Sequence, residues 1–455
     1  MSARFAMVGH PNKGKSSIVA TLAEDDAVVI SPEPGTTTHA HEYPMRLDGE
    51  LLYTLIDTPG FQRAREALTW LEAHEQGADA RAETVAEFVR KHVDDPRFRD
   101  ECELLKPIVD GAGILYVVDG SRPYNDRYQA EMEILRWTGQ PRMALINLIG
   151  NGDYVDEWRS ALGQYFSIVR VFDAMQAQFT KRIELLRAFG AIDERWAASL
   201  ERAADALVAD REHRKRVAAR AIAELLTDVL TETVTLPLGE SDDADGVREK
   251  ARGLLEDGVR RREKRTRKVV QEIYHHAGLQ IEESADSHLA EDVFSARSFS
   301  IFGLSAKQLA VTGAASGALL GGAVDAALGG ASLMLGAGIG AAIGAIGTMA
   351  GARRFAKVEL LGQRLGGYEL RVGPFADPNL PWVVLGRAIL HLKLVAERNH
   401  ARREALVMDA QQGEHLADAL DSTRRRTLDA LFKRIRRGHD ERTALTEAIL
   451  STVDI

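Results

Sequence analysis

The sequence predicts an α/β domain over residues 1–190, with a mostly parallel sheet and flanking helices, followed by a mainly α-helical C-terminal half. Apolar runs alternate with helical patterns up to about residue 190, which is the pattern of strands joined by crossover helices. Beyond that point the strand signal fades and charged helical patterns dominate. These two observations decide the fold class.

Composition narrows the class of protein further. The 455 residues exceed one ordinary domain, and 45% hydrophobic residues suffice for a sizeable core. A formal net charge of -9 argues against a surface that is wholly a nucleic-acid footprint, so DNA is not an expected partner and RNA is a disfavoured one. The single cysteine, Cys102, fits a reducing, cytoplasmic compartment, and the first strand begins too early for a secretory signal.

Six candidate strands lie in the first part of the chain. Most are continuous apolar runs, which suit burial on both faces of a parallel sheet, while the second is polar, as an edge strand is. Residues 61–110, between the third and fourth strands, have helix-forming composition and are long for a single crossover. The candidate strands are residues 5–8, 42–47, 51–56, 113–118, 143–147 and 168–172.

A phosphate-binding loop follows the first strand. The run Gly9-His10-Pro11-Asn12-Lys13-Gly14-Lys15-Ser16 lies between that strand and a helical pattern, which is the context that such a loop requires. Its glycines let successive backbone N–H groups turn toward a triphosphate, Lys15 reaches the outer phosphates, and the Ser16 hydroxyl is a Mg²⁺ ligand. The expected nucleotide contacts here are Gly9, Asn12, Lys13, Gly14, Lys15, Ser16 and Ser17.

Two later segments have the chemistry to complete this site. Residues 31–38 form a turn-rich loop whose hydroxyls can join the Mg²⁺ shell when a γ-phosphate is present. Asp57-Thr58-Pro59-Gly60 ends the third strand, and it places a carboxylate near the metal and the Gly60 N–H near the γ-phosphate. Three such segments in this order predict a nucleoside triphosphate site.

The phosphate loop with Pro11 and Asn12, the Pro-Gly-Thr-Thr run at 34–37 and Asp57-Thr58-Pro59-Gly60 resemble the bacterial GTPases of the Era and TrmE group. More narrowly, the chain resembles Era-like GTPases that carry an uncharacterised C-terminal domain with a glycine-rich apolar segment. The resemblance covers about residues 1–175. It implies a P-loop GTPase domain that binds GTP and GDP with Mg²⁺. The metal residues that it implies are Ser16, Thr37 and Asp57, with Thr36 as the alternative to Thr37.

In TrmE-like GTPases the asparagine that matches Asn12 helps to bind K⁺, which supplies positive charge during phosphoryl transfer. This sequence offers little other charge there, because Phe61 stands where Ras-like proteins place a water-orienting glutamine. We therefore expect slow unaided hydrolysis and stimulation by K⁺, with Lys15, Asn12 and Thr37 as catalytic residues. Gln62 either orients water or is a solvent-exposed residue at a helix start.

The base-recognition pattern departs from the family. Its Asn-Lys-x-Asp motif supplies an aspartate that accepts two hydrogen bonds from guanine, whereas this chain reads Asn147-Leu148-Ile149-Gly150. Asp153 either substitutes for that carboxylate or caps the next helix. In Phe172-Asp173-Ala174, Ala174 resembles the alanine whose N–H faces the base. GTP is the expected nucleotide, and relaxed base specificity is the alternative.

Three regions are expected after the GTPase domain of residues 1–190. They are a charged helical region at 191–305, a glycine-rich apolar helical hairpin at 306–352 and a mainly helical region at 353–455. The basic run at 260–268 either contacts anionic lipid headgroups or forms a solvated helix face.

Residues 308–352 contain one charge, Asp325, and repeat glycine at four-residue spacing, so glycine lines one face of each helical arm. The Gly329-Gly330 pair divides the run into two arms of about 20 residues, each long enough for a roughly 30 Å hydrocarbon core. Lys307 and Arg353 flank the ends, as expected for entry from the cytoplasmic side. We expect association with, or insertion in, the inner membrane. Packing within the protein or an oligomer is the alternative.

The sequence therefore favours a GTP-hydrolysing switch that couples its nucleotide state to a membrane lipid or a membrane protein partner. A nucleotide-gated scaffold or oligomerising binding protein with little turnover is the alternative. Pairing of two GTPase domains across their nucleotides, as in TrmE-like proteins, would give a homodimer.

Overall fold

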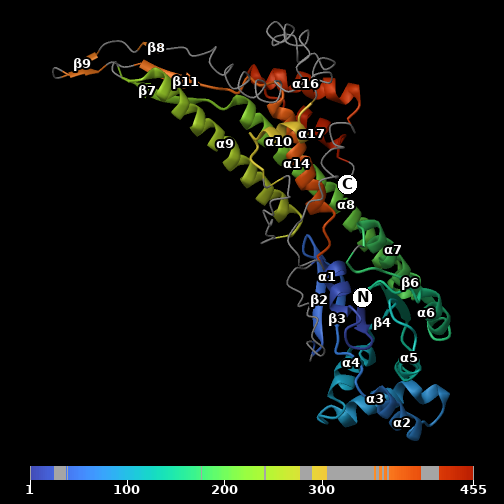
Figure 1. Cartoon of the computed structure of the whole chain (residues 1–455). Coiled ribbons are helices and arrows are strands. Elements are labelled where there is room, and N and C mark those ends of the chain that lie inside the picture. Colours follow the sequence, from blue (N-terminus) through green and yellow to red (C-terminus); the bar gives the residue numbers. More distant parts are fainter. Residues whose placement is uncertain are drawn as a thin grey trace. The chain divides into compact units, whose positions relative to one another are not determined.

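The computed structural model describes residues 2–24, 37, 39–175, 177–239, 242–276, 289, 291–304, 368–400 and 420–453, together with the backbone of 353–354, 358–360 and 363–365 (Figure 1). The predicted hairpin at 306–352 lies outside these residues. The chain divides into two compact units, Met1–Glu212 with Glu397–Arg403 and His213–Ala396 with Glu404–Ile455. The boundary falls inside the 38-residue helix α8 (Glu194–Thr231).

The first unit is built on a six-stranded sheet. Its order is β2-β3-β1-β4-β5-β6, and every neighbouring pair is parallel except β2 with β3. The predicted mostly parallel sheet is confirmed, and the polar second strand is at its edge. The strands are β1 (Ala3–Val8), β2 (His41–Leu47), β3 (Glu50–Asp57), β4 (Gly113–Asp119), β5 (Arg142–Asn147) and β6 (Ile168–Val171).

The central strands are apolar throughout because alternate side chains enter two different cores. In β1, Ala6 and Val8 pack in the core that contains residues of α2 to α6, whereas Phe5 and Met7 pack in the core of α1, α7 and the start of α8. The helices are α1 (Lys15–Ala23), α2 (Ala64–Ala73), α3 (Arg81–His92), α4 (Arg99–Val109), α5 (Arg127–Trp137), α6 (Val155–Leu162) and α7 (Phe179–Gly190).

The long segment between β3 and β4 is helical, as its composition predicts. It forms α2, a short 3₁₀ turn (Ala78–Ala80), α3 and α4, which Figure 1 shows together at one end of this unit, near α5. Buried apolar residues at helical spacing, including Leu71, Val85 and Phe88, hold these helices to one another. The segment is therefore a packed helical addition to the sheet.

A short segment from the far end of the sequence also belongs to the first unit. Residues 397–400 follow α14 (Leu380–Ala396), and Asn399 and His400 are buried. Thr21 of α1 donates a hydrogen bond to Asn399 Oδ1 at 2.7 Å, and Asn399 Nδ2 donates to Ala177 O at 3.3 Å. The chain thus returns to the sheet domain beside the loop that follows β6.

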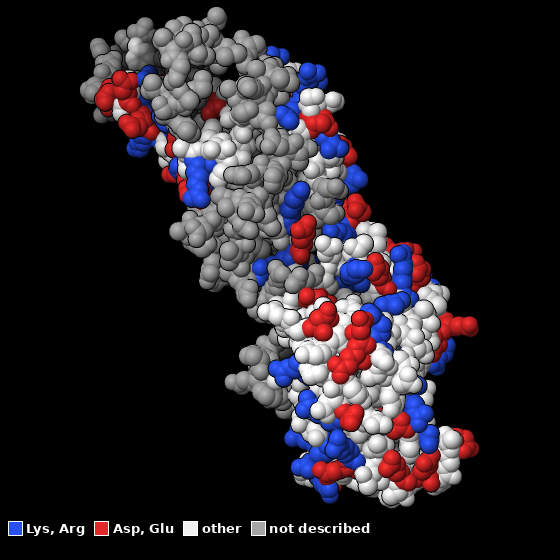
Figure 2. Space-filling view, turned by 45° about the vertical axis from the view of Figure 1, so that its right-hand side comes forward, with Lys and Arg blue, Asp and Glu red and all other residues white. Residues whose placement is uncertain are grey.

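The second unit is mainly helical, which confirms the prediction for the C-terminal half. Its other helices are α9 (Ala244–Ile273), α10 (Ala296–Phe302), α16 (Ser422–Arg436) and α17 (Arg442–Leu450). A sheet of order β7-β11-β8 joins them, with β7 (Val234–Leu238), β11 (Tyr368–Val372) and β8 (Arg353–Arg354); β9 (Val358–Leu360) pairs with β10 (Gln363–Leu365). Over the described part of the face drawn in Figure 2, side chains of both charge signs are interspersed.

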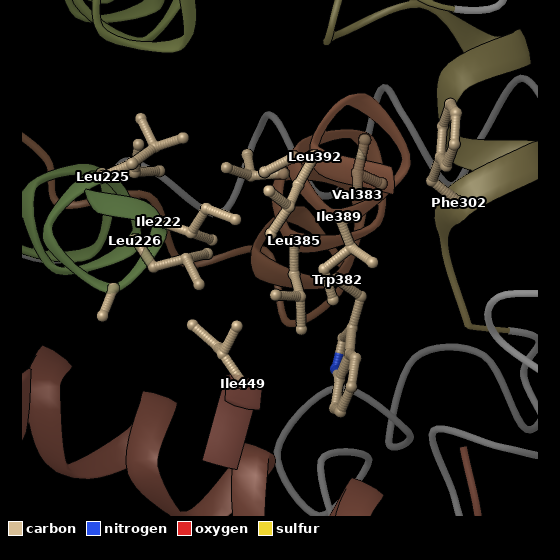
Figure 3. Packing of buried hydrophobic residues seen from close by; sticks show 14 of the residues in the cluster. Ile222, Leu225, Leu226, Phe302, Trp382, Val383, Leu385, Ile389, Leu392 and Ile449 are labelled. Atoms are coloured by element: carbon tan, nitrogen blue, oxygen red, sulfur yellow. The ribbon is translucent and has the colours of Figure 1, made fainter. Parts of the chain in front are cut away.

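Helix α14 is the centre of the second core, because 15 of its 17 residues are buried. Figure 3 shows its residues Leu385, Ile389 and Leu392 beside Ile222 and Leu226 of α8. Phe302 of α10 and Ile449 of α17 belong to the same core. Among the residues that the structure describes, no helix is both long enough and apolar enough to cross a bilayer.

Candidate nucleotide-binding site

The loop between β1 and α1 has the backbone that its glycines allow. Gly9 and Gly14 have φ of 142° and 80°, and a Cβ at Gly9 would lie 2.4 Å from Val117 O. Asn12, exposed within this loop, has φ of 58°. Ser16 and Ser17 occupy the first turn of α1, where free N–H groups and the helix dipole favour an anion.

The Lys15 ammonium lies over this loop. It is buried, and its Nζ donates to Gly9 O and His10 O at 3.3 Å each. Burial lowers the pKa of Lys15, while the charges of Asp57 and Glu131 oppose that shift. The side chain is therefore oriented by the loop whose phosphate ligand it is predicted to contact.

Three oxygen ligands converge beside the loop, and they are the residues that the sequence assigns to Mg²⁺. Ser16 Oγ donates to Asp57 Oδ2 at 2.7 Å, and Thr37 Oγ1 donates to the same oxygen at 3.3 Å. Asp57 Oδ1 is buried without a hydrogen-bond partner among the described residues. Burial raises the pKa of Asp57, and the Ser16 hydroxyl and the Lys15 charge lower it.

This donor set fits Mg²⁺, which takes oxygen ligands and keeps several waters. An unpaired, buried carboxylate oxygen is costly unless a cation or a donor meets it. The alternative residue Thr36 lies outside the described part of the chain. Within that part, no group of three or more histidine, cysteine and acidic side chains could hold another metal ion.

The segment after β3 is held against the phosphate loop. Thr58 Oγ1 donates to Met7 O at 2.7 Å, and a Cβ at Gly60 would lie 2.6 Å from Pro11 N, so only glycine fits there. Phe61 is buried in the core, whereas the Gln62 side chain is exposed two residues before α2 begins. The exposed position of Gln62 is compatible with both predicted roles.

At the base end of the site, Asn147 joins two loops. Its Nδ2 donates to Lys13 O, and its Oδ1 accepts from the Ala174 N–H, both at 3.1 Å. Asn147 and Ala174 are buried. The amide therefore fixes the phosphate loop and the loop after β6 relative to each other.

The loop after β5 packs on the loop after β4. A Cβ at Gly152 would lie 2.1 Å from the backbone oxygen of Ser121, so only glycine fits there, whereas one at Gly150, the usual aspartate position, would lie 3.1 Å from the Ser121 side-chain hydroxyl. Asp153 is exposed, and its Oδ1 accepts from Val155 N at 3.4 Å, at the start of α6. Asp153 thus makes a local contact at the end of the loop that precedes α6.

The sequence did not single out several charged partners of the loop. Lys13, predicted to contact nucleotide, is buried with its Nζ 3.4 Å from Asp119 Oδ2 at the end of β4. Buried Glu131 of α5 lies 3.1 Å from His10 Nδ1 and accepts from Tyr116 at 2.9 Å. For Asp119 the sequence offered one signal, because a carboxylate directly after an apolar strand lies at the edge of the sheet where the site is. Glu131 offered none, because its spacing is that of an ordinary helical residue.

Two family models match this chain, one in each part of the sequence. Residues 159–451, more than half of the chain, match the family model described as "Domain of unknown function (DUF3482)". The chain belongs to this family. Residues 4–147 of this DUF3482 protein match a second family model, described as "50S ribosome-binding GTPase". That range runs from β1 through Asn147, so the first unit of the DUF3482 protein contains a P-loop GTPase domain.

Individual GTPase relatives match shorter stretches of the DUF3482 protein. GTPase Der of Mycoplasma pneumoniae is 32% identical over 124 residues, which are 27% of this chain and 22% of that protein. The tRNA modification GTPase MnmE of Pseudothermotoga lettingae is 22% identical over 183 residues, 40% of this chain and 34% of that protein. The chain thus spans about a fifth to a third of the length of these relatives.

Solved structures resemble the chain at low sequence identity. An Aquifex aeolicus Era variant bound to GDP.AlF4- is 15% identical, with a TM-score of 0.30, and the match covers 61% of this chain and 91% of that one. A TM-score of 0.30 is too low to show a shared overall fold. The family models and relatives confirm the resemblance to Era and TrmE-like GTPases with an uncharacterised C-terminal domain.

Proposed function

We propose that this DUF3482 protein is a GTP-hydrolysing switch whose C-terminal half associates, from the cytoplasmic side, with the inner membrane or with a membrane protein. The observation that supports the switch is the convergence of the Ser16 and Thr37 hydroxyls on the buried Asp57 carboxylate. The Thr37 hydroxyl lies 3.3 Å from Asp57 Oδ2, beside the proposed metal position. Its contact is therefore a natural sensor of the γ-phosphate.

The chain's own residues have distinct parts in this proposal. Lys15 and the N–H groups of the loop and of the first turn of α1 bind and orient the outer phosphates. A bound Mg²⁺ supplies positive charge to the β- and γ-phosphate oxygens. In this proposal the Gly60 N–H meets the γ-phosphate and Gln62 orients water; the close packing of Gly60 on Pro11 and the exposure of Gln62 are compatible with these roles.

Stimulation by K⁺ is part of the proposal, because hydrolysis needs charge at the bridging oxygen. Asn12 supports it, since its side chain is exposed within the phosphate loop. Phosphate release should be faster in K⁺ than in Na⁺, and Asn12→Ala should remove the difference. Asn151→Ala, a change at an exposed asparagine of the loop after β5, is the matched control. Fast turnover in Na⁺ that Asn12→Ala does not alter would contradict this part.

Membrane association is supported by one face of α9. In the basic run at 260–268, Arg260 pairs with Asp292 at 2.6 Å, Arg262 pairs with Glu232, and Arg267 pairs with Glu263 at 2.6 Å. These three arginines pair with carboxylates of the same unit, so neither predicted role, contact with lipid headgroups or a solvated helix face, describes them.

The remaining cations of the run form what we call the basic stripe: Arg261, Lys264, Arg265 and Lys268. All four are exposed, and their spacing of i, i+3, i+4 and i+7 places them on one helix face. Among the described residues none of them has a carboxylate partner within ion-pair distance. Four such cations suit an anionic surface, at roughly 1 kcal/mol each near a charged bilayer.

Flotation of the full chain with liposomes tests this part. The wild type should float with vesicles that contain anionic lipid, and the alanine variant of the four stripe residues should float less. An alanine variant of Arg216, Arg220, Arg426 and Arg437, which are exposed cations on other helices of the same unit, removes the same charge and should float as the wild type does. A chain without residues 306–352 tests the glycine-rich segment separately. A wild type that stays at the bottom contradicts the membrane proposal.

A further inference from the structure

Helix α4 lies against both segments that follow the nucleotide-sensing loops. Glu101 Oε1 accepts the backbone N–H of Gln62 at 2.8 Å and of Arg63 at 2.6 Å. Two residues along the helix, Glu103 Oε2 accepts the N–H of Ala40 at 3.1 Å. The same helical turn therefore holds chain from both sides of the predicted metal site.

The spacing along α4 explains how one turn serves two segments. Arg99 and Glu103 are four residues apart and share a face, and Arg99 Nη2 lies 2.8 Å from His39 Nε2. Glu101 is midway between them and points to another face. One face of α4 thus holds residues 39–40, and the other holds residues 62–63.

Each held segment is continuous with a predicted nucleotide contact. Ala40 is three residues after Thr37, which donates to Asp57 Oδ2. Gln62 is two residues after Gly60, which packs on Pro11 of the phosphate loop. A change of conformation at either contact is transmitted through two or three residues to α4.

Glu101 is an unusual side chain for a purely structural position. The residue is fully buried, and its Oε2 has no partner among the described residues. Burial raises the pKa of this carboxyl, and the two backbone N–H groups oppose the shift. An apolar residue would pack here at lower cost, but it could not hold the two N–H groups.

We propose that α4 is a bracket that couples the two nucleotide-sensing segments, with Glu101 as a positioning residue for Gly60 to Gln62 and with Glu103 holding the end of the 31–38 loop. This rests on the proposed function, because the coupling has a purpose only if both segments respond to nucleotide. Residues 64–98, which include α2 and α3, connect residues 62–63 to α4 along the chain.

Hydrogen exchange of the full chain tests the bracket directly. With Mg²⁺ and a non-hydrolysable GTP analogue, Glu101→Leu, which removes the acceptor, should speed exchange at Gln62 and Arg63 and also at residues 39–40, which Glu101 does not touch. Glu103→Ala should have the converse effect on residues 62–63. Asp100→Ala, on the same turn with no contact to either segment in the described residues, should change neither.

A purely local helix-capping role for Glu101 predicts faster exchange at residues 62–63 alone, and that result would overturn the bracket. If Glu101→Leu does not fold, Glu103→Ala carries the same test in the reverse direction, because Glu103 is partly exposed. If the analogue does not protect residues 37–40 of the wild type, the proposed switch fails rather than the bracket.

Turnover supplies a second readout. Glu101→Leu should lower kcat for GTP by about tenfold or more, since misplaced groups cost rate steeply, while KM and the affinity for GDP stay near wild type. Asp100→Ala should keep both constants. Equal loss of kcat and of GDP affinity in Glu101→Leu would mean general damage to the site and would contradict a positioning role.

Discussion

Replacing Asn147 by alanine tests how the base end of the site is held together. The amide of this buried side chain bridges Lys13 O and the Ala174 N–H at 3.1 Å each. No backbone hydrogen bond of the sheet is removed by the change, so its effect comes from these two contacts. Asn147→Ala leaves the buried Lys13 carbonyl and the buried Ala174 N–H without their partner.

The magnitude follows from two unsatisfied buried groups. Each costs about 1–3 kcal/mol when its partner is removed, so the free energy of unfolding of the first unit should fall by about 2–6 kcal/mol. The phosphate loop and the loop after β6 also lose their common anchor. A loss of 2 kcal/mol in binding corresponds to about 30-fold weaker nucleotide affinity.

Urea unfolding followed by tryptophan fluorescence is a suitable assay, because four of the five tryptophans lie in the first unit, namely Trp70, Trp137, Trp158 and Trp196. Asn151→Ala, in an exposed position of the neighbouring loop, is the matched control and should stay near wild type. If Asn147→Ala and Asn151→Ala have the same stability and the same nucleotide affinity, the bridging role is refuted.

Three other predictions follow from single residues. Thr37→Ala should lower affinity for a GTP analogue with Mg²⁺ more than affinity for GDP, in a binding titration; equal losses would contradict a γ-phosphate sensor. Burial lowers the pKa of His391 to about 3, from about 6.5 in the unfolded chain. Below about pH 6.5 the unfolded state therefore binds a proton that the folded state does not, and the free energy of unfolding falls as the pH drops. His391→Leu should flatten that slope by up to about 1.4 kcal/mol per pH unit in urea unfolding between pH 6 and 4, and an unchanged slope would refute it. Asp153→Asn should leave the GTP-to-ATP affinity ratio unchanged if Asp153 makes only its local contact before α6, and an altered ratio would make Asp153 the base ligand. Asp173→Asn tests in the same way the carboxylate that precedes Ala174.

The local motifs could be predicted because their chemistry is contiguous in the sequence. The glycines of the phosphate loop, Lys15 and Ser16 need only a strand before them and a helix after them. Asp57 was found by the same reasoning at the end of an apolar strand. The structure brings Ser16, Thr37 and Asp57 together as expected.

Contacts between distant segments could not be predicted from patterns. Glu101 and Glu103 stand in a turn whose composition is that of any exposed helix. Their partners are 39 and 63 residues away in the sequence, and only the packing of α4 brings them into contact. Strand β7 contains Pro237, which favours a turn in the sequence but is tolerated on the edge strand that it occupies. The basic run could not be divided into paired and unpaired cations without the positions of Asp292 and Glu232.

The central claim is that the first unit is a Mg²⁺-dependent GTP-hydrolysing site, and phosphate release measures it most directly. The full chain should release phosphate from GTP in K⁺ and Mg²⁺ well above the rate of a Lys15→Ala variant, and chelation of Mg²⁺ should abolish the difference. A wild-type rate equal to that of Lys15→Ala would contradict the account, and it would favour a nucleotide-gated scaffold instead.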